Sequence, residues 1–216
     1  MKVLVTGSSR GIGRAVAMLF LENGHKVFGI DIEKSTIVHN NYTHYQEDIR
    51  SDDIHIGLFN IDILINNAGV QCSEDDIDVN LRGTINVTEK YGIQPHIKSI
   101  VFMASASAST GAEFPHYAAS KGGMVAYMKN VADRISKYGA TSNSISAGGV
   151  TTELNHHIMD DNTLYKQVLD ETMLNKWASA EEIAEWTYFV AVVNKSMTGQ
   201  DILIDNGEAL KSNFIW

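Results

Sequence analysis

The sequence predicts an α/β fold in which helices cover both faces of a seven-stranded parallel sheet, a doubly wound arrangement. Short apolar runs recur along the 216 residues, and amphipathic segments separate most of them, which is the alternation typical of β-α-β units. Only two prolines and no low-complexity tract interrupt the chain. We therefore expect one domain over residues 1–216.

Each strand is predicted from a short run rich in apolar residues. The seven candidate strands are Lys2–Thr6, Lys26–Ile30, Tyr42–Asp48, Ile61–Asn66, Ser99–Ala104, Thr141–Ser146 and Gln200–Asp205. Apolar residues at helical spacing predict the main helices over Arg14–Glu22, Ile77–Tyr91, Tyr117–Tyr138 and Ala180–Val193. Asn23-Gly24 ends the first helix as a C-terminal cap. The stretch Ser51–Asn60 is short for a covering helix, and we expect one or two helical turns there.

The composition bounds the possible partners. Hydrophobic residues make up 44% and charged residues 20% of the sequence, which excludes general disorder. A formal net charge of -9 disfavours binding to nucleic acid or to an anionic membrane. The single cysteine, Cys72, excludes an internal disulfide, and we interpret it as a small packing residue. We recognise neither an export signal nor a membrane span, so we expect a cytoplasmic protein.

A glycine-rich segment, Thr6-Gly7-Ser8-Ser9-Arg10-Gly11-Ile12-Gly13, directly follows the first predicted strand and precedes a helix. Glycines allow a sharp turn and a close backbone approach, and a helix N-terminus attracts the negative charge of a pyrophosphate. This placement favours a Rossmann-type dinucleotide site over a simple tight turn. The residues that we expect to contact the dinucleotide here are Gly7, Ser9, Arg10, Gly11, Ile12 and Gly13.

Two residues bear on the choice of dinucleotide. Asp31 ends the second strand, where a carboxylate can accept hydrogen bonds from the adenosine ribose and would repel a 2′-phosphate. This position favours NAD(H). Arg10 could instead pair with a 2′-phosphate, so NADP(H) stays possible.

Tyr117 and Lys121 are four residues apart in Tyr-Ala-Ala-Ser-Lys and therefore lie on one face of a helix. An ammonium group this close would lower the pKa of the phenol toward the range useful for general acid–base catalysis. Taken alone, such a pair is more often two surface residues. Its value as a signal depends on the other motifs in the chain.

Several motifs occur together in a fixed order: the glycine-rich segment, Asn66-Asn67-Ala68-Gly69, Asn80, Ser105 and the Tyr117/Lys121 pair. In this combination the chain closely resembles the short-chain dehydrogenase/reductase family, with 3-oxoacyl-acyl-carrier-protein reductases as the nearest comparison. The resemblance runs from Lys2 to Gly207. It implies an NAD(P)-dependent oxidoreductase that transfers a hydride between a nicotinamide cofactor and a carbonyl or secondary alcohol substrate.

The resemblance also implies roles for four catalytic residues. Tyr117 would be the acid/base on the substrate oxygen, and Lys121 would hold the nicotinamide ribose. Ser105 would hydrogen-bond the substrate oxygen, with Ser107 and Ser109 as rivals in the same serine-rich stretch. Asn80 would support a water-mediated proton path, although an asparagine in a helix also makes kinks or buried polar bonds. The further cofactor contacts that the resemblance implies are Asp48, Ile49, Asn67, Ala68, Gly69, Val150 and Thr152, together with Tyr117 and Lys121.

The segment Glu153–Trp177 follows the predicted nicotinamide loop, and we expect it to form the substrate loop. Its adjacent histidines, His156 and His157, point apart on a helix, so we expect no metal site. Similar enzymes form homodimers or homotetramers, which implies a homo-oligomer here. The apolar residues that fit either such an interface or the core are Met124, Val125, Met128 and Val131.

A catalytically idle dinucleotide-binding regulatory protein on the same scaffold is the alternative to an enzyme. The presence of Asn80, Ser105, Tyr117 and Lys121 together argues against it.

Overall fold

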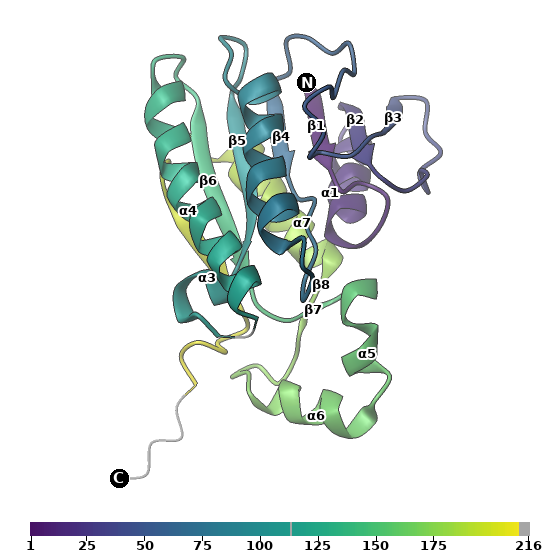
Figure 1. Ribbon diagram of the computed structural model, residues 1–216, viewed down its shortest axis with the longest axis vertical. Coiled ribbons are helices and arrows are strands. Elements are labelled where there is room, and N and C mark those ends of the chain that lie inside the picture. The colour runs from purple at the N-terminus through teal and green to yellow at the C-terminus, as the bar shows by residue number, and fades with distance from the viewer. Residues whose placement is uncertain (113, 212–216) are drawn as a thin grey trace.

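The computed structural model describes residues 1–112 and 114–211, and its centre is a sheet of seven parallel strands (Figure 1). The strand order is β3-β2-β1-β4-β5-β6-β9, so the direction of winding reverses between β1 and β4. The strands are β1 (Lys2–Thr6), β2 (Lys26–Asp31), β3 (Tyr42–Gln46), β4 (Ile63–Asn66), β5 (Ser99–Ser105), β6 (Thr141–Ala147) and β9 (Asp201–Ile204). All seven predicted strands are present, with ends within two residues of the predicted ones.

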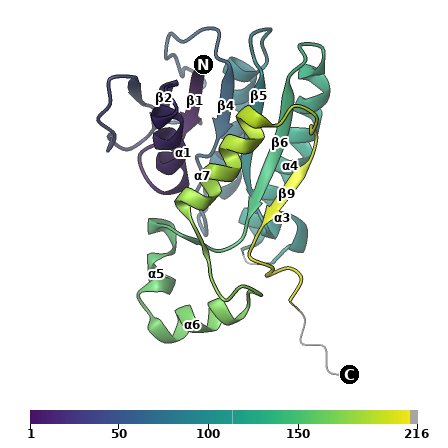
Figure 2. The same cartoon turned by 180° about the vertical axis from the view of Figure 1, so that it is seen from behind.

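Helices cover both faces of this sheet, and the predicted doubly wound fold is confirmed. One face carries α1 (Gly11–Glu22) beside α7 (Ala180–Tyr188), which continues as η4 (Phe189–Val193), and Figure 2 shows this side. The other face carries the long helix α4 (Pro115–Ser136). Next to α4 lies a continuous helix of three pieces, namely η1 (Ile77–Gly83), α2 (Thr84–Val87) and η2 (Thr88–Gly92).

Two hydrophobic layers hold the helices to the sheet. Side chains alternate along each strand, so Val3 and Val5 of β1 face the α1 side while Leu4 faces the α4 side, and all three are fully buried. Met124 and Met128 of α4 are also fully buried in the second layer. They are therefore core residues and not part of a surface for another copy.

The stretch Ser51–Asn60 contains no helix, so the expectation of helical turns there was wrong. It forms a single turn, closed by the Ile54 N–H donating to the Ser51 carbonyl, and then runs irregularly. Ile54, Ile56 and Leu58 are buried against the α4 side of the sheet. Because every second residue is apolar, an irregular chain buries all three, whereas a helix would turn Ile56 away from Ile54 and Leu58.

The chain between β6 and β9 extends past the carboxyl ends of the strands before it returns through α7 (Figures 1 and 2). A short parallel pair, β7 (Val150–Thr151) and β8 (Ala178–Ser179), closes the base of this excursion. Its helices are η3 (Glu153–Asn155), α5 (His156–Met159) and α6 (Asn162–Asp170). It coincides with the predicted substrate loop.

α7 begins with a capping box, in which the Ser179 hydroxyl accepts from the Glu182 N–H and the Glu182 carboxylate accepts from the Ser179 N–H. This fixes the return of the chain to the sheet. A small helix, α3 (Ser107–Thr110), links β5 to α4. Within residues 1–112 and 114–211 no helix is long and apolar enough to cross a membrane.

Candidate active site

A cavity of about 530 Å³ lies at the carboxyl ends of the strands, where doubly wound sheets bind their ligands. Most of the residues predicted from the sequence line it. They are Gly7, Arg10, Gly11, Ile12, Asp31, Asp48, Ile49, Asn67, Ala68, Gly69, Ser105, Tyr117, Lys121, Val150 and Thr152. Ser9, Gly13 and Asn80 are buried instead and are not among its lining residues.

The glycine-rich segment turns sharply between β1 and α1. Gly7 and Gly11 have φ angles of 67° and 52°, in the left-handed region that favours glycine. A Cβ atom at Gly7 would lie 2.8 Å from the Ala68 Cα, and the Asn67 amide donates to the Gly7 carbonyl at 3.0 Å. Because α1 starts at Gly11, its unpaired N–H groups lie at the cavity, and this cradle fits the pyrophosphate of a dinucleotide.

The Asp31 carboxylate at the end of β2 is held by two backbone N–H groups. It accepts from Ser9 and from Glu33, both at 2.9 Å, and it lines the cavity. Arg10, whose side chain is 61% exposed, lies 3.3 Å from the Glu33 carboxylate in an ion pair. Asp31, which favours NAD(H), and Arg10, which could bind the 2′-phosphate of NADP(H), therefore both line this end of the cavity. Arg10, however, already has an acidic partner.

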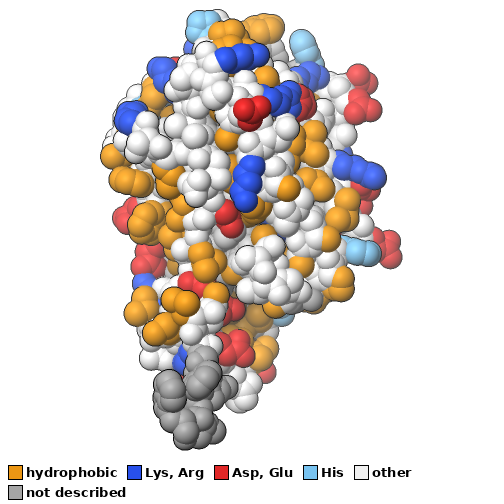
Figure 3. All heavy atoms as spheres, turned by 90° about the vertical axis from the view of Figure 1, so that its left-hand side faces the viewer, with side chains coloured by type: hydrophobic (Ala, Val, Ile, Leu, Met, Phe, Trp, Pro, Cys, Tyr) orange, Lys and Arg blue, Asp and Glu red, His pale blue; other side chains and the backbone are white. Residues whose placement is uncertain are grey.

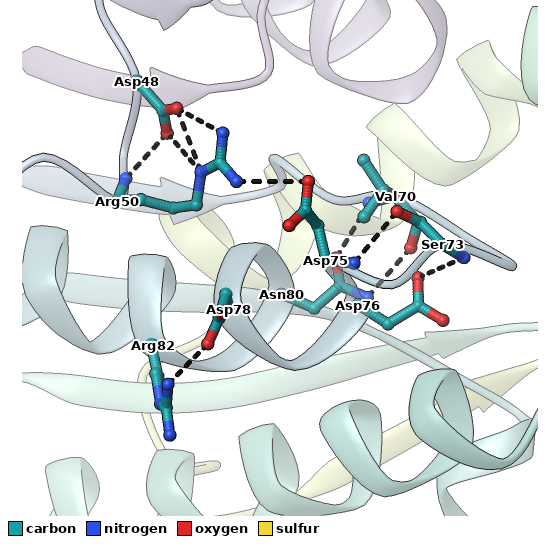
Figure 4. Close-up of polar contacts among 9 residues, drawn as sticks. All are labelled: Asp48, Arg50, Val70, Ser73, Asp75, Asp76, Asp78, Asn80 and Arg82. Atoms are coloured by element: carbon teal, nitrogen blue, oxygen red, sulfur yellow. Dashed lines mark hydrogen bonds and ion pairs between the residues drawn. The ribbon is translucent and has the colours of Figure 1, made fainter.

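The predicted adenine contact Asp48 forms a close ion pair with Arg50, a residue that sequence reasoning missed (Figure 4). Arg50 donates to both Asp48 carboxylate oxygens, the shortest contact being 2.7 Å, and this hydrogen bonding lowers the pKa of Asp48 below its ordinary value. Another guanidinium nitrogen lies 3.2 Å from the Asp75 carboxylate. Arg50 thus joins the chain after β3 to the loop after β4 at the cavity wall.

Asn80 lies in η1 and is fully buried. Its side-chain oxygen accepts from the Val70 N–H at 2.8 Å, and its amide donates to the Val70 carbonyl at 2.9 Å (Figure 4). The amide also donates to the Ser120 hydroxyl at 3.1 Å. The buried polar bond that the sequence left open as an alternative is therefore present. It fixes the loop after β4 against α4.

Tyr117 and Lys121 enter the cavity from the first turns of α4. The Lys121 ammonium lies 5.6 Å from the centre of the Tyr117 ring and donates to the Met103 carbonyl at 2.8 Å. Burial lowers the pKa of Lys121 to about 8, against a smaller opposing effect of Asp76. The lysine is still mostly protonated at pH 7, so a positive charge stands beside the phenol ring.

The three candidate serines after β5 differ in their hydrogen bonds and in their access to the cavity. The Ser105 hydroxyl oxygen accepts from the Ser107 N–H at 3.2 Å and from the Ser107 hydroxyl at 3.0 Å, and both residues line the cavity. Ser109 is exposed, and its hydroxyl donates to the Ala106 carbonyl. Ser105 and Ser107 are thus the serines that can reach a ligand in the cavity.

Sequence reasoning also missed Glu208 in the cavity wall, whereas Trp177, which lines the cavity too, is the last residue of the predicted substrate loop. Glu208 comes just after β9, and the carboxyl ends of parallel strands share one edge of a sheet, so its place after a strand was an available signal. Cys72 is exposed, with a φ of 56°, so the expectation that it is a packing residue was wrong. The described part of the chain contains no group of three or more His, Cys, Asp or Glu side chains that could hold a metal ion.

A family model described as Enoyl-(Acyl carrier protein) reductase matches residues 7–208. The 3-oxoacyl-[acyl-carrier-protein] reductase FabG of Chlamydia pneumoniae is 30% identical to this chain, in an alignment that covers 95% of this chain and 96% of that protein. A short chain dehydrogenase family protein from Francisella tularensis subsp. tularensis SCHU S4 has a TM-score of 0.86 and 29% identity, with 97% and 99% of the two chains covered. The chain belongs to the short-chain dehydrogenase/reductase family.

Another solved structure similar to this dehydrogenase/reductase is 4-hydroxyisoleucine dehydrogenase complexed with NADH. Its TM-score is 0.86 and its identity is 26%, over 98% of this chain and 99% of that one. As the sequence predicted, the chain is an NAD(P)-dependent oxidoreductase of the short-chain family, acting on a small molecule with a carbonyl or alcohol group. No observation favours the idle regulatory alternative.

Proposed function

We propose that this short-chain dehydrogenase/reductase transfers a hydride between NAD(H) and a small carbonyl or secondary alcohol substrate, with Tyr117 as its acid/base. The observation that carries the proposal is one cavity that joins the glycine-rich turn and Asp31 to Ser105, Tyr117 and Lys121. When bound, the nicotinamide supplies or accepts the hydride. The remaining chemistry, which is proton transfer and orientation, belongs to this chain.

In the proposed mechanism the Tyr117 hydroxyl gives its proton to the substrate oxygen during reduction and takes it back during oxidation. The Lys121 charge, 5.6 Å from the ring centre, stabilises the phenolate form. Because Ser105 accepts a hydrogen bond from Ser107, its own hydroxyl hydrogen is left to donate to the substrate oxygen. Asn80 acts by fixing the loop at Val70, and the water-mediated proton path remains part of the proposal.

The preference for NAD(H) rests on charge at the ribose end. Asp31 is fixed by two N–H groups and presents a carboxylate where a 2′-phosphate would lie. Arg10 is paired with Glu33, so the cation that could neutralise this phosphate is already partly compensated. We expect kcat/KM to be at least about tenfold higher with NADH than with NADPH. In Asp31→Ser this ratio should fall, and an unchanged ratio would assign the selectivity to other residues.

The proposed chemistry is tested by initial rates of NADH consumption with small ketones, sugars and 3-oxoacyl thioesters. Tyr117→Phe should lower kcat by roughly 100-fold or more, the range expected for a lost acid/base. Tyr138→Phe, just beyond the end of the same helix, is the matched control and should keep full activity. NADH fluorescence titration establishes that each variant still binds cofactor. Turnover of Tyr117→Phe within a factor of three of the parent would refute the role of the tyrosine.

The same proposal includes the organisation of the protein: one NAD(P)-binding domain over residues 1–216, a substrate loop at Glu153–Trp177, and a cytoplasmic homodimer or homotetramer. Support for association comes from hydrophobic side chains exposed on the α7 face and on β9, namely Trp186, Phe189, Val193 and Leu203. Figure 3 looks onto the β6–β9 edge and shows hydrophobic side chains reaching the surface there. Light scattering measures the molar mass of the assembly in solution, and Trp186→Lys should lower that mass by weakening the association.

A further inference from the structure

The turn after β9 carries a carboxylate, Glu208, into the wall of the cavity. Asp205 holds the turn, because its two carboxylate oxygens accept from the Gly207 N–H at 2.9 Å and from the Ala209 N–H at 2.8 Å. The Leu174 N–H donates to the Asn206 carbonyl and ties the turn to the end of the substrate loop. Glu208 therefore lies on a turn whose conformation these hydrogen bonds fix.

The strand register places this turn beside the proposed reacting end of the cavity. Ser105 of β5 is paired with Ala147 of β6, and the Ala106 N–H donates to the Ala147 carbonyl at 2.9 Å. The next residue, Gly148, has no room for a side chain, because a Cβ there would lie 2.8 Å from the Asp205 Cβ and 2.9 Å from its Cα, and the Glu208 carboxylate would follow at 3.0 Å. Gly148 thus lies about one strand spacing, roughly 5 Å, and one residue away from Ser105, and the Glu208 carboxylate lies beside Gly148.

An aromatic ring lies next to the residue that follows Gly148. A Cβ atom at Gly149 would collide with the Trp177 indole, so the ring covers the residue that follows Gly148. Tyr165 of α6 packs edge-on against Trp177, with ring centres 5.6 Å apart, and holds it in place. The Glu208 carboxylate and the Trp177 indole therefore adjoin the consecutive residues Gly148 and Gly149, and both line the cavity.

Glu208 forms no ion pair among the residues that the structure describes. The nearby Lys211 ammonium donates to the carbonyls of Asp170 and Thr172. Burial raises the pKa of Glu208 above its ordinary value, and the carboxylates of Asp205 and Glu171 add to this effect, while the Gly149 N–H opposes it. A half-buried acceptor of this kind needs a hydrogen-bond donor when a ligand displaces water from it.

The cations that line the cavity in the described chain are committed elsewhere. Arg10 is paired with Glu33, and Arg50 with Asp48 and Asp75, all on the cofactor side. Lys121 donates to a backbone carbonyl beside Tyr117. The substrate end of the cavity thus offers the Glu208 carboxylate as a hydrogen-bond acceptor, but it offers no uncommitted cation that could bind an anionic ligand. An apolar acyl chain would not suit this end either, because it has no group that could donate a hydrogen bond to Glu208.

We propose that Glu208 is a substrate-binding residue that accepts hydrogen bonds from the hydroxyl groups of a neutral polyhydroxylated substrate, a polyol or sugar, whose C–H face packs on Trp177. This assignment rests on the proposed oxidoreductase function and names its substrate class. A carboxylate can accept from two adjacent hydroxyls at once, which a simple alcohol cannot supply. The net charge of -9 also disfavours an acidic carrier protein as the donor of an acyl substrate.

The test measures kcat/KM with NAD⁺ for sorbitol and for 2-butanol, and with NADH for acetoacetyl-coenzyme A. The variants are Glu208→Gln, which keeps the shape of the side chain, and Glu171→Gln, a neighbouring exposed acid that does not line the cavity. In Glu208→Gln the ratio of sorbitol to 2-butanol activity should fall by roughly 10- to 100-fold, the range for a lost charge-assisted hydrogen bond. In Glu171→Gln the ratio should stay within twofold of the parent. Melting temperature and NADH titration identify a misfolded variant.

An unchanged ratio in Glu208→Gln would overturn the assignment, and so would a parent enzyme that prefers acetoacetyl-coenzyme A or an amino alcohol to sorbitol. These results would leave the proposed oxidoreductase function intact, because 2-butanol and acetoacetyl-coenzyme A report carbonyl chemistry without extra hydroxyls. If the parent binds NADH yet turns over no member of a broad panel, the proposed function fails and this inference fails with it.

Discussion

Lys121→Met tests whether the active site holds a charge at the expense of folding stability. Lys121 is 4% exposed, and burial lowers its pKa from 10.5 to about 8. The difference of about 2.5 between the two pKa values corresponds to about 3 kcal/mol of stability lost below pH 8 by burying the charged form. Methionine fills a similar space without a charge.

Part of this gain is offset. The variant leaves the Met103 carbonyl without the 2.8 Å hydrogen bond from Lys121, which costs about 1–2 kcal/mol for a buried acceptor. Lys121→Met should therefore be more stable than the parent by about 1–2 kcal/mol at pH 7, while it loses dehydrogenase activity. For a chain of this length the melting temperature should rise by roughly 2–8 °C.

The pH dependence has a definite sign. Because the folded pKa lies below the unfolded one, the unfolded chain binds more protons between pH 8 and 10.5, and the parent gains stability as the pH rises through that window. The advantage of Lys121→Met should thus shrink from pH 8 upward and turn into a deficit near pH 10.5. Urea unfolding of the cofactor-free protein at fixed concentration measures this. Lys129→Met, an exposed lysine on the same helix, is the control for other titrating groups. A destabilised Lys121→Met at pH 7 with no trend against pH would refute the reasoning.

Three further predictions concern the frame of the site. Asn80→Ala should lower the free energy of unfolding by about 2–4 kcal/mol, since it removes three buried hydrogen bonds, and a loss under 1 kcal/mol in urea unfolding would contradict this. Arg50→Met should raise the Kd for NADH by roughly 3- to 10-fold in fluorescence titration, because it releases the chain at Asp75; an unchanged Kd would show that the ion pair does not shape the adenine end. Gly13→Ala should be destabilised by about 2 kcal/mol or more, since its Cβ would collide with the turn, whereas Gly122→Ala in the interior of α4 should gain about 1 kcal/mol; equal melting temperatures would refute the comparison.

The central strands β1, β2, β4 and β5 could be predicted because each is a short, mostly apolar run, and such a run indicates burial without knowledge of remote contacts. β5 is buried along its whole length, and its residues from Ile100 to Ala104 are apolar, so the run itself identifies a strand inside a parallel sheet. The glycine-rich turn and the Tyr117/Lys121 spacing were readable for a similar reason. Their geometry is local, fixed by positive φ angles or by one helix face.

The sequence could not predict what depends on contacts between remote segments. Glu208 borders the cavity only because the β9 turn, capped by Asp205, meets Gly148 and the end of the substrate loop. In the sequence the one indication is that Glu208 closely follows a strand, and this does not show which residues the turn meets. Arg50 is similar, since its second partner, Asp75, is 25 residues away in the sequence. The helical turns expected at Ser51–Asn60 do not form, because Ile54, Ile56 and Leu58 alternate with residues that are not hydrophobic and all three are buried by contacts with remote segments.

Several polar groups near the cavity are buried at a cost in folding stability. Lys121 is buried with a lowered pKa, and the Asn66 side-chain oxygen is buried without a hydrogen-bond partner among the described residues. Such costs, each about 1–3 kcal/mol, are small beside the two hydrophobic layers on which the cavity edge is built. What they provide is a lysine charge held beside Tyr117 before any ligand arrives, so that little reorganisation is needed when the proton moves. This explains why the variant expected to fold better, Lys121→Met, is also one expected not to work.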